Sequence, residues 1–158
     1  MALFADSIFV PIYNYSIAKE GADQDKSVIF GNNGKITLTI YSATKNDDGT
    51  PKIDREHPIY QATANKDNFN WNGDTNKHKG SLTFCKTEKN PIGIEYSIPF
   101  ISEGGDIYAE FSGFNESGMD FGFYSDTYPV MGQENGLAWF YKDGEYTKLW
   151  GTQHSIYL

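Results

Sequence analysis

The chain has 158 residues, a formal net charge of −8, a single cysteine, and 16% aromatic residues. This length suits one domain, residues 1–158, which can bury a core without metals or disulfides. The negative charge argues against nucleic acid and anionic membranes as partners.

The start of the chain lacks the basic and apolar regions of a secretory signal. No apolar run approaches the roughly 20 residues of a membrane-spanning helix. We therefore expect no transmembrane segment, and a cytoplasmic protein or one released without a signal peptide.

Alternating apolar residues predict a first strand over residues 8–15, placed at a sheet edge because Pro11 has no N–H to donate. Asn33-Gly34 is a strong turn signal and predicts a hairpin between residues 27–32 and 35–41. In that register Ile29 lies opposite Leu38 and Phe30 opposite Thr37.

Residues 45–52 read as a loop and residues 58–63 as a short strand. The segment 65–80 is the most polar stretch of the chain, and it contains Phe69 and Trp71 with no local residues to bury them. Alternation resumes over residues 80–86, a predicted strand with Leu82 and Phe84 on one face.

Three strands are predicted over residues 92–98, 107–112 and 119–124, with Gly-containing turns between them. Paired in chain order as a meander, they form a sheet with one apolar face, which includes Ile92 and Ile94. The opposite face carries polar residues, among them Glu95 and Glu110.

Asp143-Gly144 accepts the positive φ angles of a type I′ turn and predicts a hairpin over residues 137–150. Its register sets Lys142 opposite Glu145, Tyr141 opposite Tyr146, Trp139 opposite Lys148 and Leu137 opposite Trp150. We expect the face with Trp139, Tyr141, Tyr146, Lys148 and Trp150 to be partly exposed and to contact a ligand or another subunit, because a lysine is rarely buried without a partner. Residues 154–158 are predicted as a short last strand.

Many short strands with regularly spaced turns and no amphipathic helix predict an all-β, single-domain antiparallel β-sandwich of jelly-roll-like type. An up-and-down β-barrel is the second architecture that fits this pattern.

Aromatic rings next to amide and carboxylate groups suit a sugar, because a ring packs on its apolar face while the polar groups bond its hydroxyls. We therefore expect a non-enzymatic, lectin-like module that binds a glycan or glycoconjugate, with a second copy of the chain (a homo-oligomer) as a further candidate partner. The candidate ligand-binding residues are Phe69, Trp71, Asn72, Asp74, Trp139, Tyr141, Tyr146, Lys148 and Trp150.

No cofactor, metal ligand or catalytic residue is expected, although the oxygen-rich segments 46–49 and 67–74 offer Ca²⁺ as a minor possibility. Glu95 and Glu110, on one polar face, are the only basis for a glycoside hydrolase. The composition also suits a membrane-active, insecticidal toxin-like protein or a self-assembling structural or storage protein, because both use exposed aromatic residues.

Overall fold

The structure is a computed structural model that describes residues 3–13, 30–31, 33–71, 79–113, 122–123, 125–126, 139–148 and 153–154. Its regular structure is almost entirely strand, which confirms the all-β prediction. The strands of the first half are β1 (Leu3–Ala5), β2 (Ile8–Tyr13), β3 (Ile36–Lys45), β4 (Pro51–Ile53), β5 (Tyr60–Ala64), β6 (Phe69–Trp71) and β7 (Lys79–Phe84). Those of the second half are β8 (Lys86–Lys89), β9 (Glu95–Ile98), β10 (Phe100–Ser102), β11 (Ile107–Ser112), β12 (Gly122–Phe123), β13 (Ser125–Asp126), β14 (Trp139–Lys142), β15 (Glu145–Lys148) and β16 (Gln153–His154). A short 3-10 helix, η2 (Lys66–Asn68), precedes β6.

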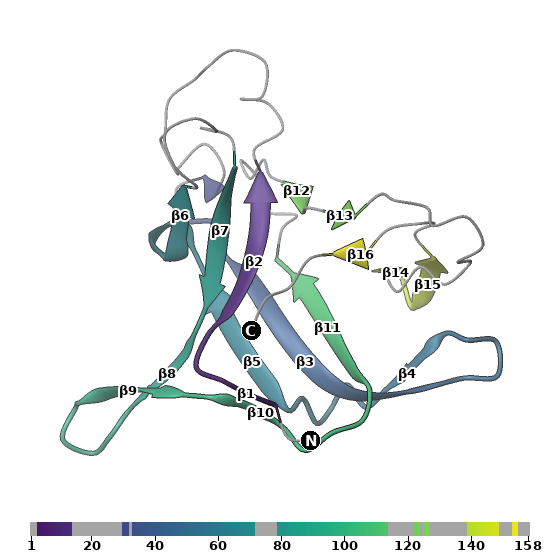
Figure 1. The fold of residues 1–158 in the computed structure, drawn as a ribbon, viewed down its shortest axis with the longest axis horizontal. Helices are drawn as coiled ribbons and strands as arrows, with labels where there is room; N and C mark the ends of the chain where they lie inside the picture. The colour runs from purple at the N-terminus through teal and green to yellow at the C-terminus, as the bar shows by residue number, and fades with distance from the viewer. Residues whose placement is uncertain are drawn as a thin grey trace, which may run out of the picture.

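The strands form two larger antiparallel sheets and several two-stranded ribbons (Figure 1). One larger sheet has the order β11-β3-β4, with β5 also paired to β3, and the other has the order β12-β2-β7-β6. The ribbons are β1–β10, β8–β9, β13–β16 and β14–β15. Within the described residues, none of these sheets closes on itself.

Strand β3 is the centre of its sheet, and its pairing overturns the hairpin predicted at Asn33-Gly34. The same β3 residues pair with β11 along one edge and with β5 along the other. Thr37 accordingly lies opposite Ser112 and Thr63, so Phe30 cannot be its strand partner. Phe30 is instead a buried core residue outside any strand, and residue 29 lies outside the described residues.

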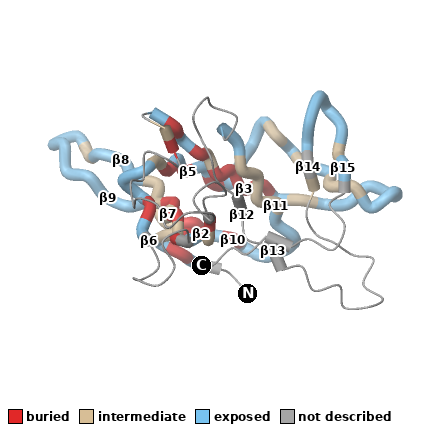
Figure 2. Tube along the Cα trace, turned by 90° about the horizontal axis from the view of Figure 1, so that it is seen from above, coloured by how far each residue is buried: buried red, intermediate tan, exposed pale blue. Residues whose placement is uncertain are grey.

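Alternate residues of both larger sheets are buried in one shared hydrophobic cluster, and its members are among the buried segments drawn red in Figure 2. β3 and β5 contribute every second residue, as the period of a strand requires. The members are Ile8, Val10, Ile12, Phe30, Ile36, Leu38, Ile40, Tyr60, Ala62, Ala64, Phe69, Leu82, Phe84 and Phe100, with Ala109 and Phe111 packed against them. The opposite face of β11, β3 and β5 is polar and aromatic.

The three strands predicted as a meander do not pair with one another. β9 pairs with β8, β11 with β3, and β12 with β2. The apolar alternation of residues 92–98 also does not mark a buried face, because Ile92, Ile94 and Tyr96 are all exposed. Residues 92–94 belong to a turn, and β9 begins only at Glu95. Alternation alone therefore identified part of a strand here, but neither its full extent, its partner nor its burial.

Several of the remaining strand predictions agree with the structure where it describes the chain. The segment 107–112 is β11, and Leu82 and Phe84 share the buried face of β7. The predicted loop 45–52 is shorter than expected, since β3 continues to Lys45 and pairs with Pro51 of β4. The edge position predicted for the first strand is wrong, because β2 lies between β12 and β7. β12 pairs only with Ile12 and Tyr13, so Pro11 itself is paired with β7 alone.

No helix in the described residues is long and apolar enough to cross a membrane.

Candidate functional site

The C-terminal hairpin β14–β15 has the register that the sequence predicts. Lys142 pairs with Glu145, Tyr141 with Tyr146, and Trp139 with Lys148. Asp143 and Gly144 adopt φ angles of 53° and 87°, the positive values that a type I′ turn requires. Trp139, Tyr141 and Tyr146 therefore share one face, as expected.

A turn after β4 brings Arg55, the only arginine in the chain, to this hairpin. Asp54 shapes the turn, because its Oδ1 accepts a hydrogen bond from the Glu56 N–H (3.2 Å) and its Oδ2 contacts His57 Nδ1 (2.8 Å). The His57 hydrogen bond also holds the pKa of the Asp54 carboxyl below its ordinary value. Such local bonds are typical of an Asp that stabilises a turn.

Arg55 connects the hairpin to strand β11. Its Nη1 donates to Glu110 Oε2 at 2.6 Å, and its Nη2 donates to the Tyr146 hydroxyl at 3.0 Å. Its Cζ lies 4.1 Å from the centre of the Tyr141 ring and 5.9 Å from that of Tyr41. The guanidinium is thus held by a carboxylate, a phenol and two aromatic rings, an arrangement that its planar shape favours over lysine.

The rings around Arg55 also pack on one another. Tyr146 meets Tyr108 and Trp139 edge to face, with ring centres 6.4 and 6.3 Å apart, and lies 4.8 Å from Tyr141. The separations fall in the range favoured for aromatic pairs. We call this set the Arg55 cluster: Tyr41, Arg55, Tyr108, Glu110, Trp139, Tyr141 and Tyr146.

The Arg55 cluster lies on the face of the β11–β3–β5 sheet opposite the core. Tyr108 pairs with Tyr41, and Glu110 pairs with Thr39, which in turn pairs with Gln61 of β5. Gln61 Nε2 donates to Thr39 Oγ1 at 3.1 Å. Tyr141 is 40% exposed, while Trp139 and Tyr146 are half-buried, so the aromatic face of the hairpin is partly open as predicted.

Burial raises the pKa of Tyr108 to about 12 from its ordinary value of 10.0, and Tyr146 and Glu110 act in the same direction. The folded protein therefore holds this proton more tightly than the unfolded chain does. The stability linked to Tyr108 is complete below pH 10 and is lost as the pH rises through about 12. We expect Tyr108→Phe to reduce the fall in the urea midpoint between these pH values, and an unchanged fall would contradict this placement.

Phe69 and Trp71, the aromatic residues of the polar segment 65–80, lie on β6 in the other large sheet and not in the Arg55 cluster. Phe69 is fully buried and meets Phe30 edge to face at 5.9 Å. Phe69 was a candidate ligand-binding residue because no residue near it in the sequence can bury it, but its cross-strand neighbours on β7 do bury it. Trp71 ends β6 opposite Gly80, while Asn72 and Asp74 lie outside the described residues. The Lys148 side chain and Trp150 also lie outside them.

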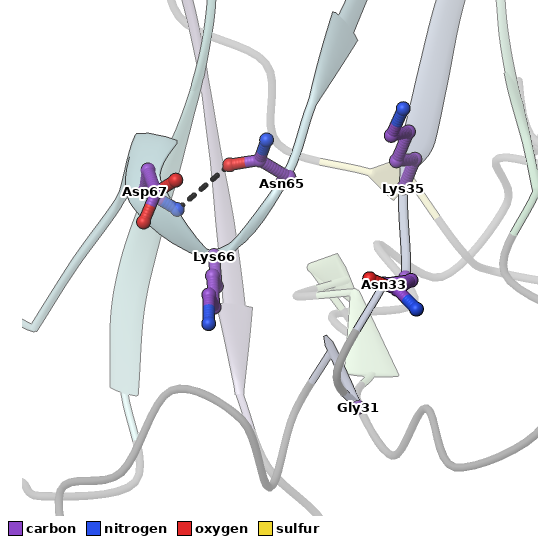
Figure 3. A pocket seen from close by; sticks show the side chains of 7 residues that line it. Gly31, Asn33, Lys35, Asn65, Lys66 and Asp67 are labelled. Atoms are coloured by element: carbon purple, nitrogen blue, oxygen red, sulfur yellow. Dashed lines mark hydrogen bonds between the residues drawn. The ribbon is translucent and has the colours of Figure 1, made fainter.

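Where η2 meets the residues before β3, there is an open pocket of about 150 Å³ (Figure 3). Its lining residues are Gly31, Asn33, Gly34, Lys35, Asn65, Lys66 and Asp67. Asn65 Oδ1 accepts from the Asp67 N–H (2.8 Å) and the Asn65 N–H donates to Asn68 Oδ1 (3.1 Å), so these groups cap η2. The pocket is smaller than the several hundred Å³ typical of small-molecule sites.

The acidic candidates of the sequence are not brought together. Glu95 is on the β8–β9 ribbon, whereas Glu110 is on β11 and is bonded to Arg55. Asp48 Oδ1 accepts from the N–H and the Oγ1 of Thr50 (2.9 and 2.6 Å), and these bonds lower the pKa of its carboxyl. In the described part of the chain, no group of three or more His, Cys, Asp or Glu side chains is placed to hold a metal ion.

The structure thus unites Trp139, Tyr141 and Tyr146 in one site and separates them from Phe69. Sequence reasoning missed Tyr41, Arg55 and Tyr108 as members of the site, and it missed the role of Glu110 as the partner of Arg55. A signal was present, because the chain has 12 lysines but only one arginine, the residue best suited to bind carboxylates and aromatic rings together.

Comparison with family models, curated proteins and solved structures found no match to this chain.

Proposed function

We propose that this protein is a non-enzymatic carbohydrate-binding module and that the Arg55 cluster is its sugar-binding site. The observation that carries the proposal is the partly exposed Tyr141 ring beside the Arg55–Glu110 ion pair. The Arg55 and Glu110 side chains are themselves 33% and 21% exposed. An apolar ring surface next to a few placed polar groups is the usual composition of a small-molecule site.

Each part of the cluster matches a part of a sugar. The C–H groups of a pyranose pack against the face of an aromatic ring, whose π electrons are negative. The guanidinium supplies donors and the Glu110 carboxylate supplies acceptors, so together they bond vicinal hydroxyls. Arg55 has five N–H groups, and its two hydrogen bonds to Glu110 and Tyr146 leave others for a ligand.

The packing of the site supports affinity as well. Tyr141 is held by Tyr146 on the paired strand and by Arg55 from the turn after β4. A ring that is already ordered loses less conformational entropy when a ligand binds, which leaves more of the contact energy for affinity.

The separation of Glu95 from Glu110 supports binding over glycoside hydrolysis. Hydrolysis of a glycosidic bond requires two carboxylates on either side of it, one of them able to donate a proton. Glu110 is bonded to an arginine, and the carboxylate expected beside it is on another ribbon.

A jelly-roll-like β-sandwich is our proposal for the complete fold. It is supported by the shared cluster, to which β2, β6 and β7 of one sheet and β3 and β5 of the other all contribute. In such a fold the Arg55 cluster lies on an outer face, where a glycan has access.

A glycan array followed by titration with the strongest ligand tests the proposed function. We expect Tyr141→Ala to weaken binding about 30-fold or more, the effect of losing an aromatic hot spot. Tyr96→Ala is the matched control, because Tyr96 is a similarly exposed tyrosine on a different hairpin and should leave the affinity unchanged. Absence of glycan binding, or equal affinity of Tyr141→Ala and wild type, would refute the proposal.

A further inference from the structure

The β8–β9 hairpin projects from the rest of the described structure (Figure 1). It ends in a tip that carries two isoleucines. The tip is the turn Asn90–Ile94. Ile92 is 80% exposed and Ile94 is 59% exposed, so two large apolar side chains face solvent. Two such side chains two residues apart at the end of one hairpin are a candidate contact surface.

Every backbone N–H of the tip is bonded within the tip. The Ile92 and Ile94 N–H groups both donate to Asn90 Oδ1, at 3.1 and 2.8 Å. The Gly93 N–H donates to the Asn90 carbonyl at 2.8 Å, and the Asn90 N–H donates to the Ile94 carbonyl at 3.0 Å. Pro91 has no N–H. No backbone donor in this turn therefore depends on water.

These hydrogen bonds reduce the cost of moving the tip from water into lipid. Irregular backbone is excluded from lipid because each unpaired polar group there carries a large cost. A turn whose donors are all satisfied by its own residues avoids the donor part of that cost, and its isoleucines gain from leaving water.

The base of the tip carries charges of both signs. Lys89 pairs with Glu95 in the strand register, and Lys86 Nζ lies 3.6 Å from Glu88 Oε1. The Tyr96 hydroxyl donates to Glu88 Oε2 at 3.4 Å, which places an aromatic residue at the same level. Tyrosine is enriched where a protein meets lipid headgroups.

We propose that the Asn90–Ile94 tip inserts Ile92 and Ile94 into the interface of a membrane with phosphocholine headgroups. A phosphocholine headgroup carries a phosphate and a quaternary amine. The base of the tip offers both opposite charges, from the lysines Lys86 and Lys89 and the glutamates Glu88 and Glu95. The net charge of −8 opposes an anionic membrane. A second copy of the chain is a poorer fit, because two isoleucines cannot supply the roughly 800 Å² per partner of a stable protein interface.

Flotation with phosphatidylcholine vesicles that contain no glycolipid tests this proposal independently of the sugar site. We expect the wild-type protein to float with these vesicles and to bind more weakly when phosphatidylserine is added. Ile92→Ser should weaken partitioning about tenfold, from the lost apolar burial. Asn90→Ala should also weaken it although both isoleucines remain, because two backbone donors lose their acceptor.

The matched control is Ile101→Ser, since Ile101 is a similarly exposed (52%) isoleucine on β10, away from the tip. It should bind vesicles like the wild type, and circular dichroism should show all variants folded. Failure of the wild type to bind phosphatidylcholine, or an equal loss in Ile101→Ser, would overturn the proposal. Self-association that Ile92→Ser abolishes, without vesicle binding, would overturn it in favour of a second copy as the partner.

Discussion

Replacement of Phe69 with alanine is expected to lower the free energy of unfolding by about 3–5 kcal/mol, the usual cost of truncating a buried phenylalanine. The ring is fully buried and lies against Phe30 and over Gly80 on the neighbouring strand. A Cβ at position 80 would overlap this ring, so glycine leaves the space that Phe69 fills.

A urea titration of Phe69→Ala measures this effect. Phe9→Ala is the matched control, because Phe9 lies on β2 of the same sheet but is 43% exposed, and its truncation should cost about 1 kcal/mol or less. If Phe69→Ala lowered the free energy of unfolding by only about 1 kcal/mol, as expected for Phe9→Ala, Phe69 would not be a core residue. The Phe69 ring would then again be a candidate ligand-binding group.

Replacement of Arg55 with alanine is expected to affect both stability and binding. It removes the hydrogen bonds to Glu110 and Tyr146 and the contact with the Tyr141 ring, which together link β14–β15 to β11. Glu110 is then left partly buried without this partner. We expect a loss of about 2 kcal/mol, below the 3–5 kcal/mol of a fully buried pair because both side chains are partly exposed to solvent.

The variant Arg55→Lys tests whether the positive charge at position 55 is sufficient or whether the planar guanidinium is required. Lysine keeps the positive charge but lacks the planar group that donates to two partners while it lies on a ring. It should therefore recover part of the stability and little of the glycan affinity. Full affinity in Arg55→Lys would contradict a specific role for the guanidinium.

The sequence predicted best those elements that local chemistry determines. The β14–β15 register follows from Asp143-Gly144 alone, since only a few residues accept two consecutive positive φ angles. The bounds of β11 and the buried face of β7 likewise follow from residues close together in the chain.

Features set by distant partners were predicted poorly. Asn33-Gly34 has the composition of a hairpin turn, but β11 and β5 already occupy both edges of β3. Phe69 has only polar sequence neighbours, and its burial depends on Gly80 of β7. Arg55 is 55 residues from Glu110 and 91 from Tyr146, so no local pattern could reveal their site.

Sequence alternation also failed to distinguish a buried strand from an exposed one. Residues 92–98 alternate as a half-buried strand does, yet only the end near Ile98 reaches the body of the protein. Apolar residues at every second position indicate that one face of a strand is apolar. That face is buried only if a second layer of the protein packs on it.

The most direct test of the proposed sugar site is an NMR titration of the isotope-labelled protein with the strongest ligand from the array. We expect saturable shift changes at the Arg55 guanidinium, the Trp139 indole and the Tyr141 ring, which lie in one cluster although Arg55 is far from the other two in the sequence. Shift changes confined to the pocket of Asn33, Lys35 and Asn65, or no saturable change at the Arg55 cluster, would contradict the account.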